Sequence, residues 1–133
     1  MRTTQSIADS TEALMASRPV QDVTLSVIAA EAGVTVQTVS RHMGTREGCF
    51  RTVAARVDDR VRRQREASSP SDVSAAIASL VAHYEMEGRL MLNLLSQEFG
   101  DEPFAAEAVS RGRAYHRDWV QRSWPSCPVL ACS

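Results

Sequence analysis

Apolar residues recur at intervals of three and four along most of the chain, which is the spacing of one face of an α-helix. The first such face comes before Pro19, which cannot continue a helix, and it comprises Ile7, Ala8, Thr11, Leu14 and Met15. The pattern predicts an all-α protein of about seven helices, with three in an N-terminal head, one long connecting helix and three in the body.

The segment 24–50, TLSVIAAEAGVTVQTVSRHMGTREGCF, predicts a helix-turn-helix. Thr24 and Thr35 each stand where a hydroxyl would cap the start of a short helix. Gly33 stands between the two helices, where a left-handed residue ends the first one at little cost. Val39 falls on the buried face of the second helix. A short polar helix braced by a tight glycine turn is the geometry that enters a DNA major groove.

Polar side chains on this second helix and at the neighbouring helix starts are the candidate DNA contacts. Arginine pairs with guanine and glutamine with adenine, so Arg41 and Gln37 are expected to read bases. Arg46 is expected to hold a phosphate together with the backbone amides at the start of its helix, because helix N-termini bind anions. The complete set of candidate DNA-binding residues is Thr24, Thr35, Val36, Gln37, Thr38, Ser40, Arg41, His42, Thr45 and Arg46.

A long helix that begins after Thr45 is expected to connect the head to the body. Its apolar residues Phe50, Val53, Val57 and Val61 fall on one inward face. The arginine cluster near its end is expected to be solvated, and it consists of Arg60, Arg62, Arg63 and Arg65.

Residues 5–60 resemble the N-terminal domain of TetR-type transcriptional regulators. The matching residues, whose spacings all agree, are Thr24, Ile28-Ala29, Ala32-Gly33-Val34-Thr35, Thr38-Val39, His42 and Thr45-Arg46-Glu47. The resemblance implies a regulator that binds a double-stranded DNA operator, as a repressor that a small-molecule effector releases. The chain departs from such proteins in having Ser40 where an aromatic ring is usual, Met43 where Phe is usual and Arg46 where Lys is common. Ser40 therefore lacks a large ring that would contact phosphate.

Pro70 and the surrounding serines, ASSPSD, mark a boundary after the connecting helix. The expected domains are a DNA-binding domain with its connecting helix at 1–66, a partial effector-binding and dimerisation domain at 71–123, and an irregular tail at 124–133. In the body, Gly88 is expected to separate a first helix from a second one that ends near Phe99, and a third helix is expected from about Phe104 to Ser123. The apolar stripe of the first body helix is Val73, Ala76, Ile77, Leu80, Val81 and Tyr84.

The stretches SLVAHYEMEGRLMLNLLSQE and RGRAYHRDWVQR resemble the beginning of the effector domain of the same regulators. This resemblance implies a pocket for a small apolar effector, with His83, Tyr84, Met91 and His116 as candidate lining residues. The alternative is that Tyr84 and Met91 are core residues and that the two histidines are half-exposed.

The family's effector domain usually has two further long helices that form its dimer, and the chain ends before them. A shortened gene product, an expression or annotation artefact and a naturally short regulator are the three interpretations. The candidate dimer surfaces are the helix at 104–119 and the apolar faces of 73–95, and an active chain is expected to form a homodimer through the last helix. A shortened product is expected to be a monomer or aggregate that binds DNA weakly. The alternative function is a helical interaction module that no longer binds an operator and pairs with a full-length relative.

Composition narrows the class of protein. The net charge is −1, yet residues 34–65 contain eight arginines and three acidic residues, as a DNA-facing segment would. No apolar run is long enough to span a bilayer and no signal-peptide core is found, so a cytoplasmic bacterial protein without a membrane partner is expected. The three cysteines predict neither disulfides nor a metal site, and no cofactor motif or catalytic residue pattern points to an enzyme.

Overall fold

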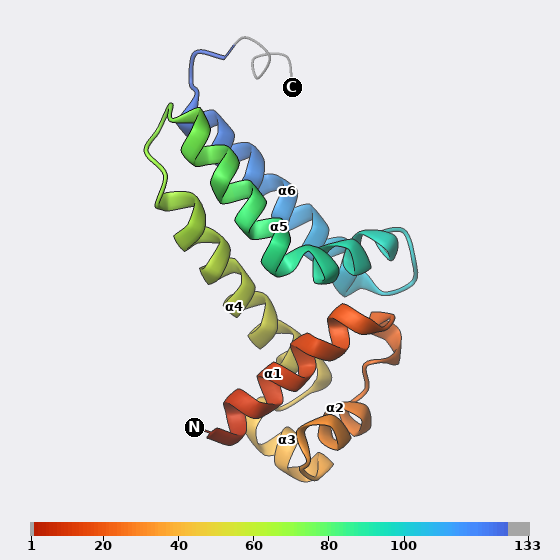
Figure 1. Ribbon diagram of the computed structural model, residues 1–133. Coiled ribbons are helices and arrows are strands. Elements are labelled where there is room, and N and C mark those ends of the chain that lie inside the picture. The colour runs from red at the N-terminus through yellow and green to blue at the C-terminus, as the bar shows by residue number, and fades with distance from the viewer. Residues whose placement is uncertain (1, 128–133) are drawn as a thin grey trace.

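The protein is helical throughout, in a computed structural model that describes residues 2–127. Within that range it contains no β-strand, and it has six α-helices rather than seven (Figure 1). They are α1 (Arg2–Ser17), α2 (Leu25–Ala32), α3 (Val36–Met43), α4 (Arg46–Glu66), α5 (Val73–Ser96) and α6 (Pro103–Ser123), with a short 3₁₀ turn at Val20–Asp22. The expected all-α fold is therefore confirmed.

The head is formed by α1, α2, α3 and the first turns of α4, which pack around one apolar core (Figure 1). The buried residues of α1 are the five that its periodicity predicted, and the helix ends at Ser17, before Pro19. The side chains that fill the head core without exposure to solvent include Ile7, Val20, Val23, Ile28, Val39, Cys49 and Phe50.

The three helix starts in the head follow threonines, as predicted. The hydroxyl oxygens of Thr24, Thr35 and Thr45 each accept a hydrogen bond from the backbone amide three residues later. Such caps satisfy amides that have no partner inside the helix, and each stabilises the helix by about 1 kcal/mol. The capping residues therefore fix where α2, α3 and α4 begin.

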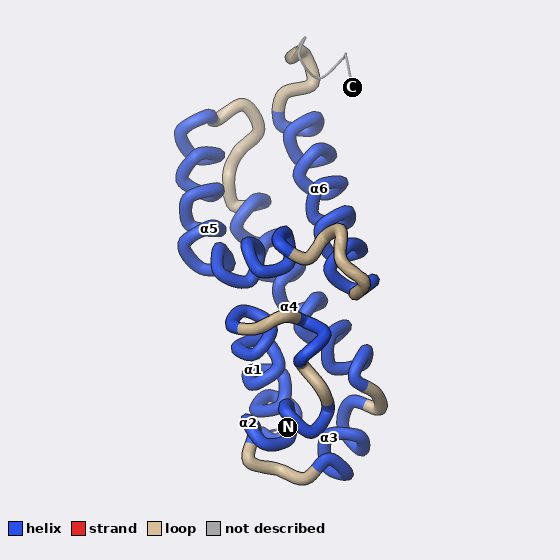
Figure 2. Tube along the Cα trace, turned by 90° about the vertical axis from the view of Figure 1, so that its right-hand side faces the viewer, coloured by secondary structure: helices blue, strands red, loops and turns tan. Residues whose placement is uncertain are grey.

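The body consists of the rest of α4 together with α5 and α6, and each of these three helices contacts the other two (Figure 2). Phe50, Val53 and Val57 of α4 are buried and Val61 is half-buried, which confirms its predicted inward face. Since α4 begins in the head and ends in the body, it is the rigid connection between them.

Gly88 does not interrupt a helix, contrary to the sequence prediction. It lies inside α5, which runs unbroken from Val73 to Ser96, and this is why the body has one helix fewer than expected. A glycine inside a helix costs only about 1 kcal/mol relative to alanine. The buried face that runs from Ala76 to Leu90 and Leu94 is continuous, and its packing outweighs that cost.

Asp72 caps α5 by accepting a hydrogen bond from the amide of Ala75 at 2.9 Å. In the same loop, the amide of Ser71 donates to the carbonyl oxygen of Ser123 at 3.1 Å and so ties the end of α6 to the start of α5. The predicted division into two domains between residues 66 and 71 falls in this loop. It stays a prediction, because α1 of the first expected domain packs against α5 of the second. Residues 124–127 of the expected tail are not helical, and the remainder lies outside the described residues.

Candidate functional site

Helix α3 presents a polar face outward from the head. Val39 is fully buried beneath it, whereas Gln37, Arg41 and His42 are exposed. Val36, at the first position of the helix, is 40% exposed. The predicted arrangement of one buried valine below exposed glutamine and arginine side chains is confirmed.

The angle between α2 and α3 is fixed by a left-handed turn at Gly33, which has φ 70° and ψ 31°. The amide of Val34 donates to the carbonyl oxygen of Ala29 at 3.0 Å, a bond that closes the end of α2. A side chain at Gly33 would be strained by this positive φ. The predicted glycine turn is therefore confirmed, and it sets how α3 projects from the head.

The three capping threonines are all exposed at the surface of the head. Each hydroxyl uses its oxygen to accept from an amide, and the hydroxyl hydrogens of Thr24 and Thr45 are left for a donation to solvent or to a phosphate. Thr35 differs, because its hydroxyl also lies 2.9 Å from the hydroxyl of half-buried Thr38.

His42 and Ser40 have contacts that narrow what they can do. The His42 Nδ1 atom lies 2.9 Å from the Thr4 hydroxyl, so Nε2 is the ring nitrogen that can face a ligand. Ser40 is half-buried and presents only a small polar side chain.

Arg46 is half-buried, and most of its contacts are inside the protein. Its Nε donates to the carbonyl oxygen of Val23 at 2.7 Å, and its Nη2 donates to the carbonyl oxygen of Val20 at 2.6 Å. Nη2 also contacts the carboxylate of Glu102 at 3.2 Å, and the guanidinium carbon lies 4.4 Å from the centre of the Phe50 ring. Nε and Nη2 are used inside the protein because the loop before α2 leaves two carbonyl groups within reach, and the expected phosphate role of Arg46 stays a prediction.

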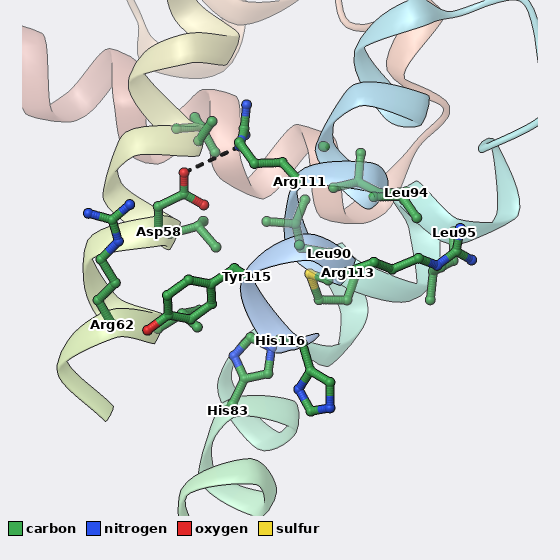
Figure 3. A pocket seen from close by; sticks show the side chains of 18 of the residues that line it. Asp58, Arg62, His83, Leu90, Leu94, Leu95, Arg111, Arg113, Tyr115 and His116 are labelled. Atoms are coloured by element: carbon green, nitrogen blue, oxygen red, sulfur yellow. Dashed lines mark ion pairs between the residues drawn. The ribbon is translucent and has the colours of Figure 1, made fainter. Parts of the chain in front are cut away.

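A cavity of about 530 Å³ lies between α4, α5 and α6, and all four candidate effector residues line it (Figure 3). His83 and Met91 come from α5 and His116 from α6, while Tyr84 is more than half exposed at the edge. In Figure 3, His83 and His116 lie at one end of the view and Leu94 and Leu95 toward the other. The volume is within the usual range for small-molecule sites, which are mostly apolar with a few polar groups.

Arginine side chains dominate the charged lining of this cavity. The five are Arg62, Arg65, Arg111, Arg113 and Arg117, with Asp58 as the acidic residue. Arg111 pairs with Asp58 at 3.4 Å, and Arg113 pairs with Glu98. The cavity therefore has an excess of positive charge.

The arginine cluster at the end of α4 is only partly solvated. The prediction that all four arginines are solvated is therefore wrong for Arg60 and Arg65. Arg60 forms ion pairs with Glu12 of α1 and with buried Glu87 of α5, and these hydrogen bonds raise the pKa of its guanidinium. Arg65 is 3% exposed because α4 packs against α5 and α6 there. The spacing of Val53, Val57, Val61 and Arg65, four residues apart, was the signal that Arg65 shares the buried face.

Residues 7–53 match the family described as "Bacterial regulatory proteins, tetR family". This segment is therefore a TetR-type helix-turn-helix domain. No curated protein and no solved structure matched the chain. The match covers α2, α3 and most of α1, and it supports a domain of the DNA-binding regulator type.

The TetR-type head accommodates the departures noted in the sequence without a change of fold. Met43 is half-buried against the head core, and its sulfur lies 3.5 Å from the Thr52 hydroxyl. Arg46 uses the planar fork of its guanidinium to contact two carbonyl groups and Glu102 at once, which a lysine could not reproduce.

Sequence reasoning missed the residues that join the TetR-type head to the body. The Phe104 ring at the start of α6 lies 5.0 Å from the Phe50 ring of α4, centre to centre. Gln97 accepts a hydrogen bond from the amide of Val20 at 2.7 Å, and Asn93 donates to two carbonyl oxygens at the end of α1. These partners are more than 50 residues apart along the chain, so no local pattern could have paired them.

Cys49 is buried in the head core, and burial raises the pKa of its thiol, so the group stays protonated and packs as an apolar side chain. Cys127 is half-buried, and Cys132 lies outside the described residues. Residues 2–127 hold no group of three or more histidine, cysteine or acidic side chains that could bind a metal ion. Among the helices described, none combines the length and the apolar character needed to cross a membrane.

Proposed function

We infer that the protein binds a double-stranded DNA operator through α3, as a repressor that is released when a small molecule occupies the body cavity. The observation that carries this proposal is the exposed polar face of α3 above buried Val39, on a helix anchored by the left-handed turn at Gly33. Such a helix fits the major groove, where base edges differ in their pattern of donors and acceptors.

Within this proposal, Gln37 and Arg41 contact base edges and the other exposed groups contact phosphates. The phosphate contacts come from the hydroxyls of Thr24 and Thr45, from Nε2 of His42 and from the first amides of α3 and α4. Helix N-termini favour anions through these amides and the helix dipole. Val36, Thr35, Thr38 and Ser40 complete the contact surface at the start and middle of α3.

Communication between cavity and head is supported by the residues that both share. Met15 of α1, Val53 of α4 and Phe104 of α6 line the cavity and also pack in or against the apolar core. The Phe104 ring packs against the Phe50 ring, and the residue before α6, Glu102, binds Arg46. A ligand that shifts the start of α6 would therefore shift the start of α4, and with it the position of α3.

Replacing Arg41 or Gln37 with alanine is expected to relax sequence preference, by about 1–3 kcal/mol at the base that loses its contact. Replacing Thr45 with serine, which keeps the cap, should leave that preference unchanged. Arg89→Ala is the control, because Arg89 is exposed on α5, outside the helix-turn-helix. Binding to a library of duplexes at two salt concentrations measures both preference and affinity. Equal losses on every sequence would assign Arg41 and Gln37 to phosphates instead.

Operator binding calls for two recognition helices, since half-sites lie about 34 Å apart. The expected dimer surface on α6 has no large apolar side chain exposed within the described residues, whereas α5 has a whole stripe of them. This stripe follows one face of the helix, and its exposed members are Val73, Ile77, Val81, Tyr84, Leu92 and Leu95. We therefore move the proposed homodimer contact from α6 to α5.

Ile77→Glu is expected to convert a dimer into a monomer and to lower operator affinity, because a charge would be buried at the centre of the contact. Ala78→Glu is the matched control, since Ala78 is the next residue, is exposed and lies outside the stripe. Sedimentation of the wild type and both variants gives the masses, and titration with duplex DNA gives the affinities. A wild-type monomer that binds one operator at nanomolar affinity would contradict the proposed dimer.

The second candidate function is an interaction module that pairs with a full-length relative, and the exposed α5 stripe is the observation that favours it. The two functions differ in one measurement. A purified chain that prefers no DNA sequence, yet forms a stable heterodimer with a complete TetR-type regulator, would favour the interaction module over the operator-binding repressor.

A further inference from the structure

A buried arginine lies at one end of the body cavity without an acidic partner. Arg65 is 3% exposed, and it takes part in none of the ion pairs formed by the described residues. Its Nη1 lies 3.0 Å from Nδ1 of His116, and its guanidinium carbon lies 4.5 Å from the centre of the Trp119 ring. A buried charge is costly unless it is paired and hydrogen-bonded. Within the described residues, this charge thus has a histidine and an aromatic ring as neighbours but no acidic partner.

Neighbouring polar atoms also lack partners. Within residues 2–127, Arg65 Nε, His83 Nδ1 and the Tyr115 hydroxyl are buried and form no hydrogen bond. All three residues line the cavity. One acceptor could satisfy all three, because an arginine can only donate and the other two can donate when they are neutral.

The protonation states of these side chains also allow them to donate hydrogen bonds to an acceptor. Burial and then the nearby Arg65 charge lower the pKa of His83 and of His116, so both rings are neutral near pH 7. Burial raises the pKa of the Tyr115 hydroxyl, which therefore keeps its proton. Burial lowers the pKa of Arg65 as well, but an arginine remains charged at neutral pH. The end of α4 adds only the partial negative charge of the helix dipole.

A large part of the cavity lining is apolar, and the cavity is too large for a lone small anion. Val57, Leu90, Leu94 and Phe104 line it away from Arg65. We propose that the cavity takes an apolar molecule that carries one carboxylate group, with the carboxylate bound by Arg65, His83 and Tyr115. This inference rests on the proposed function, in which the cavity is the effector site. A carboxylate matches the planar fork of the guanidinium and supplies several acceptor sites.

The test compares decanoate, 1-decanol and acetate as probes, by calorimetric titration of the full chain at pH 7.5. Decanoate is expected to bind at least about tenfold more tightly than 1-decanol, because a charge-assisted hydrogen bond contributes that much or more. Acetate, which has the charge without the apolar chain, is expected to show no binding. If 1-decanol binds as tightly as decanoate, the site does not recognise a carboxylate and the proposal is wrong. If acetate binds as tightly as decanoate, the site does not recognise an apolar chain and the proposal is also wrong.

Arg65→Met separates ligand binding from a purely structural role. Methionine keeps an apolar side chain against Trp119 and removes the unpaired charge, so the unliganded variant is expected to melt at or above the wild-type temperature. The variant is also expected to lose the preference for decanoate over 1-decanol. Arg113→Met is the control, because Arg113 lines the same cavity but is paired with Glu98. Retention of the preference by Arg65→Met, or failure of decanoate to bind the wild type, overturns the proposal.

Titration of duplex DNA in the presence and absence of decanoate distinguishes this inference from the proposed function. If decanoate binds with the expected preference and leaves DNA affinity unchanged, the carboxylate site is supported and its role as an effector site is contradicted. If 1-decanol binds as tightly as decanoate and releases DNA, the effector role of the cavity is supported and the carboxylate inference is contradicted.

Discussion

Replacing Gly48 with alanine is expected to unfold the head and abolish DNA binding. A Cβ atom at this position would lie 2.0 Å from the carbonyl oxygen of Met43 and 3.1 Å from its carbonyl carbon. Both are backbone atoms at the end of α3, so rotation of a side chain cannot relieve the clash. The close approach exists because Gly48 is in the first turn of α4, where its amide donates to Thr45. We expect a loss of about 3 kcal/mol or more in the free energy of unfolding.

Gly88→Ala is the matched control for this substitution. A Cβ atom at Gly88 would meet no heavy atom within 4 Å, and the residue lies inside α5. The free energy of unfolding should therefore rise by up to about 1 kcal/mol, because alanine favours helix. Thermal denaturation followed by circular dichroism measures both variants. A stable, DNA-binding Gly48→Ala protein would contradict the tight junction between α3 and α4.

Arg46→Ala is expected to lower the free energy of unfolding by about 2–3 kcal/mol, because hydrogen bonds to charged groups are the stronger ones. The substitution removes the donors to the carbonyl groups of Val20 and Val23 and leaves Glu102 without its partner. It also removes the cation that lies over the Phe50 ring. The melting temperature should fall by on the order of 10 °C. Arg46→Lys should recover only part of this loss, since an ammonium group lacks the planar fork.

Arg51→Ala separates this structural role from a phosphate contact. Arg51 is exposed on α4, one turn after Arg46, and should lose no stability when it is replaced. Denaturation curves and DNA titrations of both variants make the comparison. An Arg46→Ala protein with the wild-type melting temperature and uniformly weaker DNA binding would restore the phosphate contact and contradict the internal role.

The helices of the head and their boundaries could be predicted from local sequence alone. Threonine caps before α2, α3 and α4, the left-handed position of Gly33 and the periodic burial of α1 all depend on residues within one or two turns of each other. Local hydrogen bonding and steric limits decide such features, so they can be recognised without knowledge of the rest of the fold. The exposed face of α3 followed from the same periodicity.

Packing between distant segments, in contrast, sets which polar side chains face inward and makes α5 continuous. Arg46 has an arginine's usual exposed position in the sequence pattern, but two carbonyl groups and Glu102 lie within reach of it in space. Arg65 is buried by packing of α4 against distant helices, and Gly88 stays helical because one buried face of α5 runs past it. Each outcome depends on contacts between segments far apart along the chain, and long-range packing outweighs local preference there.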